Sequence, residues 1–330
     1  MRKNWQSNLP RNPIPGLRQE ADEALNYYLN RDLLEKSAPP IHELWDLPDA
    51  EKISRKQLAD GSWKYPGKIH ESVPGQNYSL LETYRNLRIL VEVYGFSSEH
   101  LAMQNAAEYV FSCQKEEGDI RGILGNQYMP YYHGAILELL IKAGFGNDPR
   151  TIRGLDWLLA MRQEDGGWIV PTQAVPSKER TPDYWQSGPL KPDRSKPHAH
   201  LATGMALRAF AAHPDYRYRS EVLKAGMALK SRFFQADKYN DRKASSYWFK
   251  FQFPFWWSNL VTCLDSLARL GFDLSDQDIC RGLDWFVANQ EEDGLWPTGY
   301  GSGKKSGENR RWVGLAICRL LKQYFQGAIL

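Results

Sequence analysis

The stretch that decides the fold is RGLDWFVANQEEDGLW, residues 281–296. Residues 153–168 read RGLDWLLAMRQEDGGW, so the same pattern occurs earlier in the chain without a gap. Both copies begin with Arg-Gly-Leu-Asp-Trp, continue through an Asp-Gly pair and end in Trp. Chance is a poor explanation for this agreement, and the chain is therefore built from internal repeats.

The second half of this pattern, Gln-x-x-Asp-Gly-x-Trp, returns elsewhere in the chain in complete or degenerate form. Further copies begin at Gln57, Gln114 and Gln235. The first is complete, the second has Ile120 in place of Trp, and the third is a relic. In the copy at 153–168, Arg162 occupies the Gln position and Gln163 follows it. Because Asp-Gly favours a tight turn, each copy is expected to join two helices.

Segments with helical periodicity lie on both sides of the copies. The segments before them are about 98–113, 149–162, 217–235 and 276–290, and those after them are about 78–94, 131–143, 198–212, 256–270 and 309–325. Three of the latter end in Gly-Phe, at 95–96, 144–145 and 271–272, where glycine can cap the last helical carbonyls.

These segments make at least five helical hairpins, and 17–37 with 41–56 could supply a sixth. Repeats that cannot bury their faces alone must stack, and closing the stack into a ring removes its exposed ends. We therefore predict an all-α fold, an (α/α)6 toroid of five to six hairpins. It should form a single domain over residues 1–330, with 1–15 as an extended N-terminal arm.

The overall composition excludes some function classes. The 42 basic and 39 acidic residues give a net charge of +3, which leaves no electrostatic footprint for nucleic acid. The four cysteines form no CxxC pair, and the N-terminal stretch lacks the apolar segment of a signal peptide. We expect a cytoplasmic protein with no cofactor and no metal. Association with a membrane surface through exposed aromatic residues stays open, as does the oligomeric state.

The Gln-x-x-Asp-Gly-x-Trp copies resemble the QW repeats of squalene and oxidosqualene cyclases, within the terpenoid-cyclase and protein-prenyltransferase superfamily. The organisation is most similar to single-domain prokaryotic squalene-cyclase-like proteins. This resemblance implies an α/α toroid in which Gln and Trp tie hairpins together, and an isoprenoid as small-molecule partner. The DxDD proton donor of the class II cyclases is absent. Prenyltransferase zinc sites place Asp two residues before Cys, whereas Cys263 here precedes Asp265.

The Gly-Phe ends allow the second helices of the hairpins to be aligned, and these helices should line the centre of the ring. One helix face is then polar while its neighbours are apolar. Asp183, in the long loop at 169–197, could reach the mouth of the ring. The candidate catalytic residues are Asp265, Glu138, His200, Glu82 and Asp183.

Candidate substrate-binding residues come from the same register and from an aromatic run before residue 260. They are Tyr131, Tyr132, His133, Trp256, Trp257, Ser258, Arg310 and Arg311. Aromatic ring faces attract cations and could shield a carbocation or hold a hydrocarbon. The same aromatic residues could instead be core packing at a helix start, and a polar stripe could be a solvated face.

Three functions remain open on the sequence. The first is a terpenoid-cyclase-like enzyme or isoprenoid-binding protein, in which an acid in the cavity would start cyclisation or isomerisation. The second is a carbohydrate-active lyase or hydrolase with Glu138 and Asp265 as an acid–base pair. The third is a non-catalytic toroid that binds a lipid or a partner. Converging titratable groups in a concave site are the feature common to all three.

Overall fold

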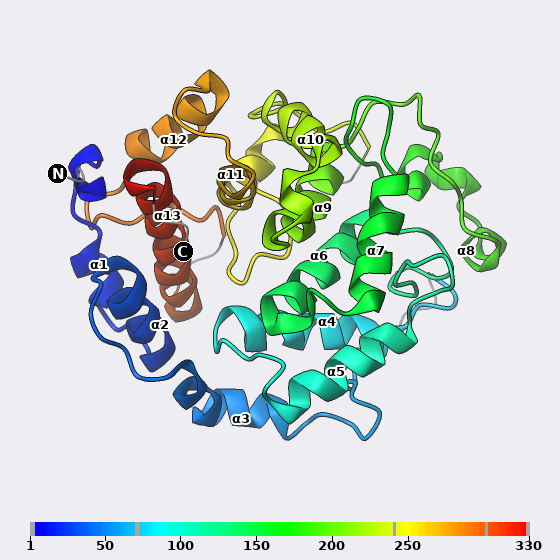
Figure 1. The fold of residues 1–330 in the computed structure, drawn as a ribbon, viewed down its shortest axis with the longest axis horizontal. Helices are drawn as coiled ribbons and strands as arrows, with labels where there is room; N and C mark the ends of the chain where they lie inside the picture. Colours follow the sequence, from blue (N-terminus) through cyan, green and yellow to red (C-terminus); the bar gives the residue numbers. More distant parts are fainter. Residues whose placement is uncertain (1–3, 70–72, 240–241, 301–302, 328–330) are drawn as a thin grey trace.

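The computed structural model describes residues 4–69, 73–239, 242–300 and 303–327, and these form helices arranged in two concentric layers (Figure 1). The inner layer contains α2 (Glu23–Tyr28) continued by the π-helical turn η2 (Leu29–Leu33), α4 (Tyr78–Glu92), α6 (Pro130–Leu140) continued by the π-helical turn η4 (Ile141–Phe145), α9 (His200–Ala212), α11 (Leu260–Arg269) and α13 (Lys304–Gln326). The outer layer contains α1 (Ile14–Arg18), α3 (Pro48–Ser54), α5 (Leu101–Ser112), α7 (Pro149–Ala160), α10 (Ser220–Lys230) and α12 (Gln277–Ala288). The short α8 (Pro182–Gln186) lies in the loop between α7 and α9.

Outer and inner helices alternate along the chain, so the described residues form six hairpins. Every residue of α6 is buried, as is every residue of α9 except the last, because outer helices cover one side of them and inner neighbours flank the other. The prediction of an all-α toroid is confirmed.

The repeat motifs hold each outer helix to the next. The side-chain amide of Gln57 donates to the carbonyl of Ala102 at the start of α5, at 2.8 Å. Gln114 donates in the same way to the carbonyl of Arg150 in α7, also at 2.8 Å. A glutamine amide suits this position because its two N–H donors reach a carbonyl of its own turn and a carbonyl of the next outer helix together.

The motif tryptophans fasten each turn to the helix that precedes it. The indole N–H of Trp63 donates to Ile53 O at 2.8 Å, that of Trp168 to Leu158 O at 2.7 Å and that of Trp296 to Phe286 O at 2.7 Å. These rings are almost fully buried, so a hydrogen bond for the indole N–H is required as well as packing. The Gln and Trp residues are therefore structural.

The degenerate copies keep the turn and change the contacts. At Ile120 the backbone N–H donates to the side chain of His133 at 3.0 Å, where Trp63 and Trp168 donate to threonine hydroxyls. Gln163 binds the carbonyls of the loop before α9 and not an outer helix. The side-chain amide of Gln235 donates to Ser231 O, four residues earlier in its own segment, at 2.9 Å.

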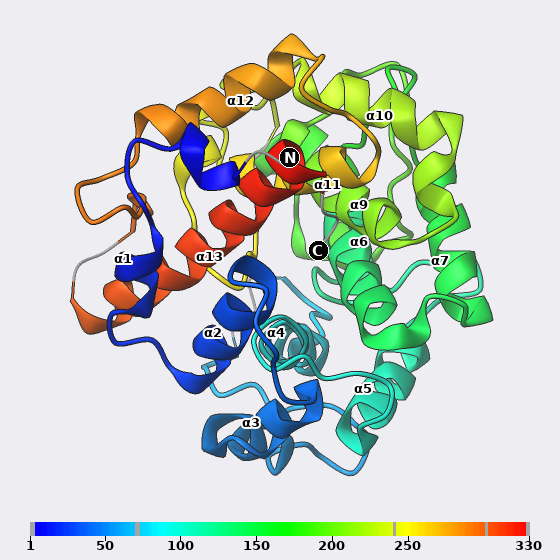
Figure 2. The same cartoon turned by 60° about the vertical axis from the view of Figure 1, so that its left-hand side comes forward.

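The ring closes through the N-terminal segment, which lies beside α13 and α12 (Figure 2). Gln290 in the last motif donates to Arg11 O and accepts from Arg11 N, both at 2.9 Å. The predicted extended arm is wrong for its described part, because Trp5–Asn8 form a 3-10 helix and Trp5 is buried against α13. Burying the large apolar surface of Trp5 is favourable, and an extended arm in solvent would leave that surface exposed to water.

Candidate functional site

Two cavities lie between the inner helices, and Phe253 lines both of them. The first, which we call the charged cavity, has a volume of about 420 Å³ and is lined by residues from every inner helix. The second, which we call the acidic-rim cavity, has a volume of about 1120 Å³ and lies between α2 and α13 on one side and α3 and α4 on the other.

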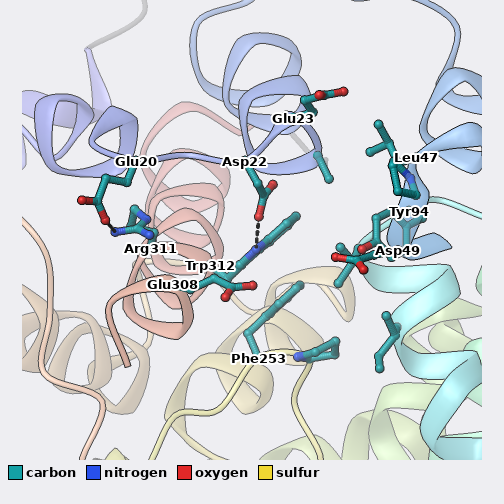
Figure 3. Close-up of a pocket in the computed structure, with 15 residues that line it drawn as sticks. Glu20, Asp22, Glu23, Leu47, Asp49, Tyr94, Phe253, Glu308, Arg311 and Trp312 are labelled. Atoms are coloured by element: carbon teal, nitrogen blue, oxygen red, sulfur yellow. Dashed lines mark hydrogen bonds and ion pairs between the residues drawn. The ribbon is translucent and has the colours of Figure 1, made fainter. Parts of the chain in front are cut away.

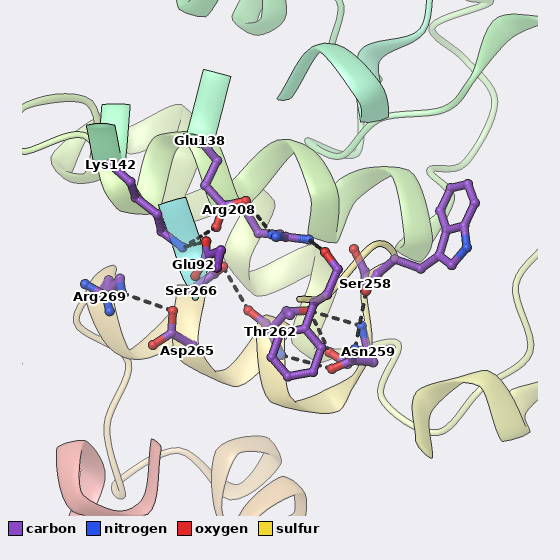
Figure 4. Close-up of polar contacts among 12 residues, drawn as sticks. Glu92, Glu138, Lys142, Arg208, Ser258, Asn259, Thr262, Asp265, Ser266 and Arg269 are labelled. Carbon is purple, nitrogen blue, oxygen red and sulfur yellow. Dashed lines mark hydrogen bonds and ion pairs between the residues drawn. The ribbon is translucent and has the colours of Figure 1, made fainter. Parts of the chain in front are cut away.

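The charged cavity contains five basic side chains and four carboxylates. They are Arg31, Lys142, Arg208, Arg269 and Arg319, with Asp32, Glu92, Glu138 and Asp265. One half of the set is a continuous network around Glu138 (Figure 4). Lys142 Nζ lies 2.7 Å from both Glu92 and Glu138, and Arg208 Nε lies 2.6 Å from the other Glu138 oxygen. The guanidinium of Arg208 also donates to Phe255 O at 3.2 Å.

The other half of the set is built around Asp32 and Asp265. Arg31 Nε and Arg319 Nε donate to Asp32 at 2.5 and 2.7 Å. Asp265 pairs with Arg269 one turn later, at 3.0 Å. The two guanidiniums on Asp32 also lie over the ring of Tyr28, 4.9 Å from its centroid for Arg31 and 4.6 Å for Arg319.

Ion pairs lower the pKa of three of these carboxylates, Asp32, Asp265 and Glu92. Burial alone would raise the pKa of Asp32, but the attraction of Arg319 and the hydrogen bond from Arg31 lower it below its ordinary value. Burial is likewise outweighed at Asp265 by Arg269, and at Glu92 by Lys142, and both pKa values are lowered. These carboxyl groups therefore hold no proton to donate at neutral pH.

Basic groups are more accessible than most of the carboxylates they pair with. The side chain of Arg319 is 22% exposed and that of Lys142 is 32% exposed, whereas Asp32 and Glu138 are only 4% and 6% exposed. At Asp265 the order is reversed, because this carboxylate is 36% exposed against 25% for Arg269. Arg208 and Glu138 are equally buried, so the positive charge that the cavity presents to a ligand is clearest at Arg31 and Arg319, which lie in front of Asp32.

The acidic-rim cavity combines exposed carboxylates with an apolar floor (Figure 3). The carboxylates are Glu20, Asp22, Glu23, Asp49 and Glu308. The floor includes Ile89, Val93 and the rings of Phe253 and Trp312, which stack with centroids 5.0 Å apart and planes at 2°. The indole N–H of Trp312 donates to Asp22 at 3.4 Å.

Aromatic side chains fill the ring at the opposite end of the inner helices. They are Tyr84, Tyr131, Tyr132, Trp256 and Trp257. The indole N–H of Trp256 donates to Tyr132 OH at 3.3 Å, and the guanidinium of Arg88 lies 4.4 Å from the Trp256 ring centroid. Only about 20 Å³ of free volume adjoins Trp256 and Trp257, so these rings pack on one another and leave little room for a ligand.

The predicted catalytic residues separate into two groups. The structure brings Glu138 and Asp265 into the charged cavity. It does not bring Glu82, His200 or Asp183 there. Glu82 pairs with Arg85 on its own helix, at 2.7 Å. Asp183 is exposed on α8, at the periphery of the ring (Figure 1).

His200 lies in the first turn of α9, where the ring wall is packed. Its ring stacks on Trp248 with centroids 4.4 Å apart, and its backbone N–H is capped by Asp237. Burial lowers the pKa of His200 to about 4, so its imidazole is neutral at neutral pH. The register placed it on the inner face correctly, but packing removes it from the cavity.

The predicted binding residues also have mixed placements. Ser258 donates to Leu201 O at 3.1 Å and borders the small space beside Trp257. His133 is fully buried between the Ile120 turn and Gly154 O, and Arg310 pairs with Glu291 and Asp293 of the last motif. These contacts are structural. Arg311 lines the acidic-rim cavity, 3.9 Å from Glu20.

Sequence reasoning missed most of the charged cavity. The missed residues are Tyr28, Arg31, Asp32, Glu92, Lys142, Arg208, Arg269, Arg319 and Gln323. A usable signal was present for two of them, because Lys142 and Arg269 lie four residues after Glu138 and Asp265 and so share their helix faces. No register was available for Arg31 or Arg319, whose helices lack a Gly-Phe end.

Within the described residues, no group of three or more His, Cys, Asp or Glu side chains could hold a metal ion. The same part of the chain contains no helix both long and apolar enough to cross a bilayer.

The fold and its cavities define an α/α toroid with a charged centre. No protein-family model matches the chain, and no curated protein matches its sequence. Among solved structures, a protein from Actinoplanes is similar over 86% of this chain and 87% of that one, with 14% identity and a TM-score of 0.45. A variant of the type II terpene cyclase MstE from Scytonema, in complex with its substrate geranylgeranyl dihydroxybenzoate, is similar over 86% and 85%, with 13% identity and a TM-score of 0.44.

Proposed function

We propose that this protein binds an isoprenoid-class amphiphile, with an anionic head in the charged cavity and an apolar chain in the acidic-rim cavity. The observation that carries this proposal is the adjacency of two cavities of opposite character, which share Phe253. One presents basic groups from several helices, and the other has an aromatic and aliphatic floor.

The charges that line the two cavities also determine which end of the ligand enters each cavity. An anionic head is attracted by the accessible guanidinium groups of the charged cavity and repelled by the carboxylates around the other cavity. Ile89, Val93 and the stacked rings of Phe253 and Trp312 offer apolar surface to a chain, and burying apolar area provides affinity that is insensitive to salt. A prenyl diphosphate has this distribution of charge and hydrocarbon.

The proposal is for binding and not for protonation-initiated cyclisation. That reaction needs a carboxylic acid that holds its proton, and the DxDD motif is absent. The lowered pKa of Asp265 has the opposite sign from a general acid. The same argument weakens an acid–base pair of Glu138 and Asp265 acting on a sugar, because both carboxylates are occupied by cations.

Binding can be measured by isothermal titration calorimetry with geranylgeranyl diphosphate, geranylgeraniol and inorganic diphosphate. We expect the prenyl diphosphate to bind more tightly than either part alone. Ile89→Asp should weaken binding of both prenyl compounds at least about tenfold, since a carboxylate in the floor must be desolvated by the chain. It should leave inorganic diphosphate unaffected.

The matched control is Leu274→Asp, which places the same charge at an exposed leucine outside both cavities. Equal affinities for geranylgeranyl diphosphate and inorganic diphosphate would overturn the proposal, as would loss of prenyl binding in the control alone. Incubation followed by mass spectrometry of the extracted lipid tests turnover, and a new hydrocarbon product would replace the binding function with an enzymatic one.

A further inference from the structure

Gln323 is a buried side chain whose donor is unsatisfied. It lines the charged cavity from α13, it is only 7% exposed, and among the described residues its Nε2 makes no hydrogen bond. Buried amide N–H groups are almost always paired, because an unpaired one loses its hydration without replacement. An orphan donor that lines a cavity therefore points to an acceptor supplied by a ligand.

The groups around Gln323 are also donors. Arg319 lies one helical turn before it and lines the same cavity, and Arg31 faces Arg319 across Asp32. A guanidinium carries five N–H donors, and the hydrogen bonds of Arg319 to Asp32 use its Nε and a single terminal nitrogen. Donors therefore remain on Arg319 for a further acceptor.

Asp32 and Tyr28 hold these guanidiniums in place. The Asp32 carboxylate is 4% exposed and binds both of them from behind, while the Tyr28 ring lies under both. Lys322 adds a third anchor by donating to Asp32 O at 2.6 Å. Groups fixed in this way lose little entropy when they bind, which is the condition for a preorganised anion site.

In the opposite half of the charged cavity, the basic groups are matched by carboxylates of the protein. Lys142 lies between the carboxylates of Glu92 and Glu138, and Arg208 bonds both Glu138 and Phe255 O. Their positive charge is neutralised by the protein itself. A negatively charged ligand is therefore drawn to the half of the cavity formed by η2 and α13.

From this arrangement we infer that Gln323, Arg319 and Arg31 form an oxyanion subsite for a phosphate or diphosphate group, with Gln323 as the residue that selects for it. The inference rests on the proposed function for the identity of the whole ligand, and it adds the chemical class and the location of the head. A tetrahedral oxyanion offers several acceptor oxygens at once, so it can satisfy an amide and two guanidiniums together.

Inorganic diphosphate is the probe, titrated calorimetrically into the full chain at fixed ionic strength. Gln323→Glu replaces the amide donor by a carboxylate of the same shape, and we expect diphosphate affinity to fall at least about tenfold. Gln104→Glu is the control, because Gln104 is an exposed helical glutamine on α5. The inference is overturned if Gln323→Glu and the control bind diphosphate as the natural protein does.

A second variant separates a binding role from a structural one. Gln323→Met keeps the volume and removes the orphan donor, so the unliganded protein should melt at the same or a higher temperature while diphosphate affinity falls. A lower melting temperature with unchanged diphosphate affinity would show that Gln323 is structural, and would overturn the inference.

The same titrations distinguish this inference from the proposed function. If geranylgeraniol binds but a diphosphate head adds no affinity, the oxyanion subsite fails and chain binding survives. If inorganic diphosphate binds through Gln323 but the prenyl chain adds nothing, the subsite stands for a free phosphate compound and the isoprenoid proposal fails.

Discussion

The outer turns and the charged cavity follow opposite rules. In the outer turns the same residue type makes the same hydrogen bond in alternate hairpins, as Trp63, Trp168 and Trp296 do with the preceding helix. In the cavity, the inner helices do not repeat one contact: Asp265 pairs with Arg269 on its own helix, whereas Asp32 pairs with Arg319 from the other end of the chain. The architecture is therefore encoded where the repeats agree, and the charged lining of the cavity is encoded where they diverge.

The difference has an energetic counterpart. A repeated turn is a local contact that each hairpin completes with its neighbour, so its loss is confined to one junction. The cavity network is shared among helices that are distant in sequence, and removing one partner leaves another buried charge without compensation. Substitutions in the network should therefore have larger effects on stability than substitutions in the turns.

The cavity network should be the most sensitive to removal of a single partner. Glu138→Leu leaves Arg208 buried without its carboxylate and Lys142 with only Glu92, and we expect a loss of about 3–5 kcal/mol in the free energy of unfolding. Urea denaturation followed by circular dichroism measures it. Glu51→Leu, which breaks an exposed pair with Arg55, should cost no more than about 1 kcal/mol. Equal losses in the two variants would contradict the distinction between a shared buried network and a local contact.

One degenerate turn should make stability depend on pH. Burial lowers the pKa of His133 to about 4 from an ordinary 6.5 and outweighs the hydrogen bond to Gly154 O, which acts in the opposite direction. The neutral ring accepts from Ile120 N at 3.0 Å. The unfolded chain therefore binds the proton first, so stability is complete above pH 6.5 and falls as the pH decreases toward 4, by about 3 kcal/mol in all.

His133→Thr supplies the acceptor that the other turns use and removes the titrating group. Its free energy of unfolding, measured at a series of pH values, should depend on pH less steeply between pH 6.5 and 4 than that of the natural chain. The difference in slope should correspond to the uptake of about one proton on unfolding. Parallel curves for the two proteins would mean that the histidine does not carry this dependence.

A motif glycine should tolerate alanine less well than a glycine in open surroundings. Gly61 has a φ of +86°, and an added Cβ would lie 2.1 Å from the backbone oxygen of Asn105 in α5. We expect Gly61→Ala to cost at least about 2 kcal/mol, since both the backbone conformation and the approach of α5 must change. Gly75 has a φ of +74° with nothing near its Cβ position, so Gly75→Ala isolates the conformational part, about 1 kcal/mol. Thermal melting of the two variants makes the comparison, and a larger effect at Gly75 would contradict it.

The fold was predictable from the sequence because its determinants are local and repeated. A turn between two helices is predicted by Asp-Gly at 60–61 and at 293–294, together with the tryptophan that follows each pair. The Gly-Phe ends allowed α4, α6 and α11 to be aligned with one another. This alignment predicted that Glu138 and Asp265 face the centre of the ring, and both line the charged cavity.

The rest of the site depends on contacts that the sequence pattern does not contain. His200 has the right register, but Trp248, from a loop whose path was not predicted, covers it. Arg31 and Asp32 lie after α2 in a π-helical turn, which shifts the helical period by which such residues are recognised. Arg319 meets Asp32 only because the ring closes, and ring closure joins the two ends of the chain.

Ring closure itself gives the last and smallest prediction. Gln290 exchanges hydrogen bonds with the backbone of Arg11 and also donates to Gly294 O, so Gln290→Ala removes both hydrogen bonds between the last motif and Arg11. We expect a loss of about 1–2 kcal/mol in the free energy of unfolding, with faster amide hydrogen exchange confined to the N-terminal segment and the last turn. Gln235→Ala is the matched control, because the amide of this relic glutamine donates to Ser231 O in its own segment, and its effect should stay within about 0.5 kcal/mol. An equal effect of both substitutions would mean that the motif glutamine acts within its own turn. The packing of Trp5 against α13 and the contacts of Asp32 with α13, and not the repeated hydrogen bond, would then hold the two ends of the ring together.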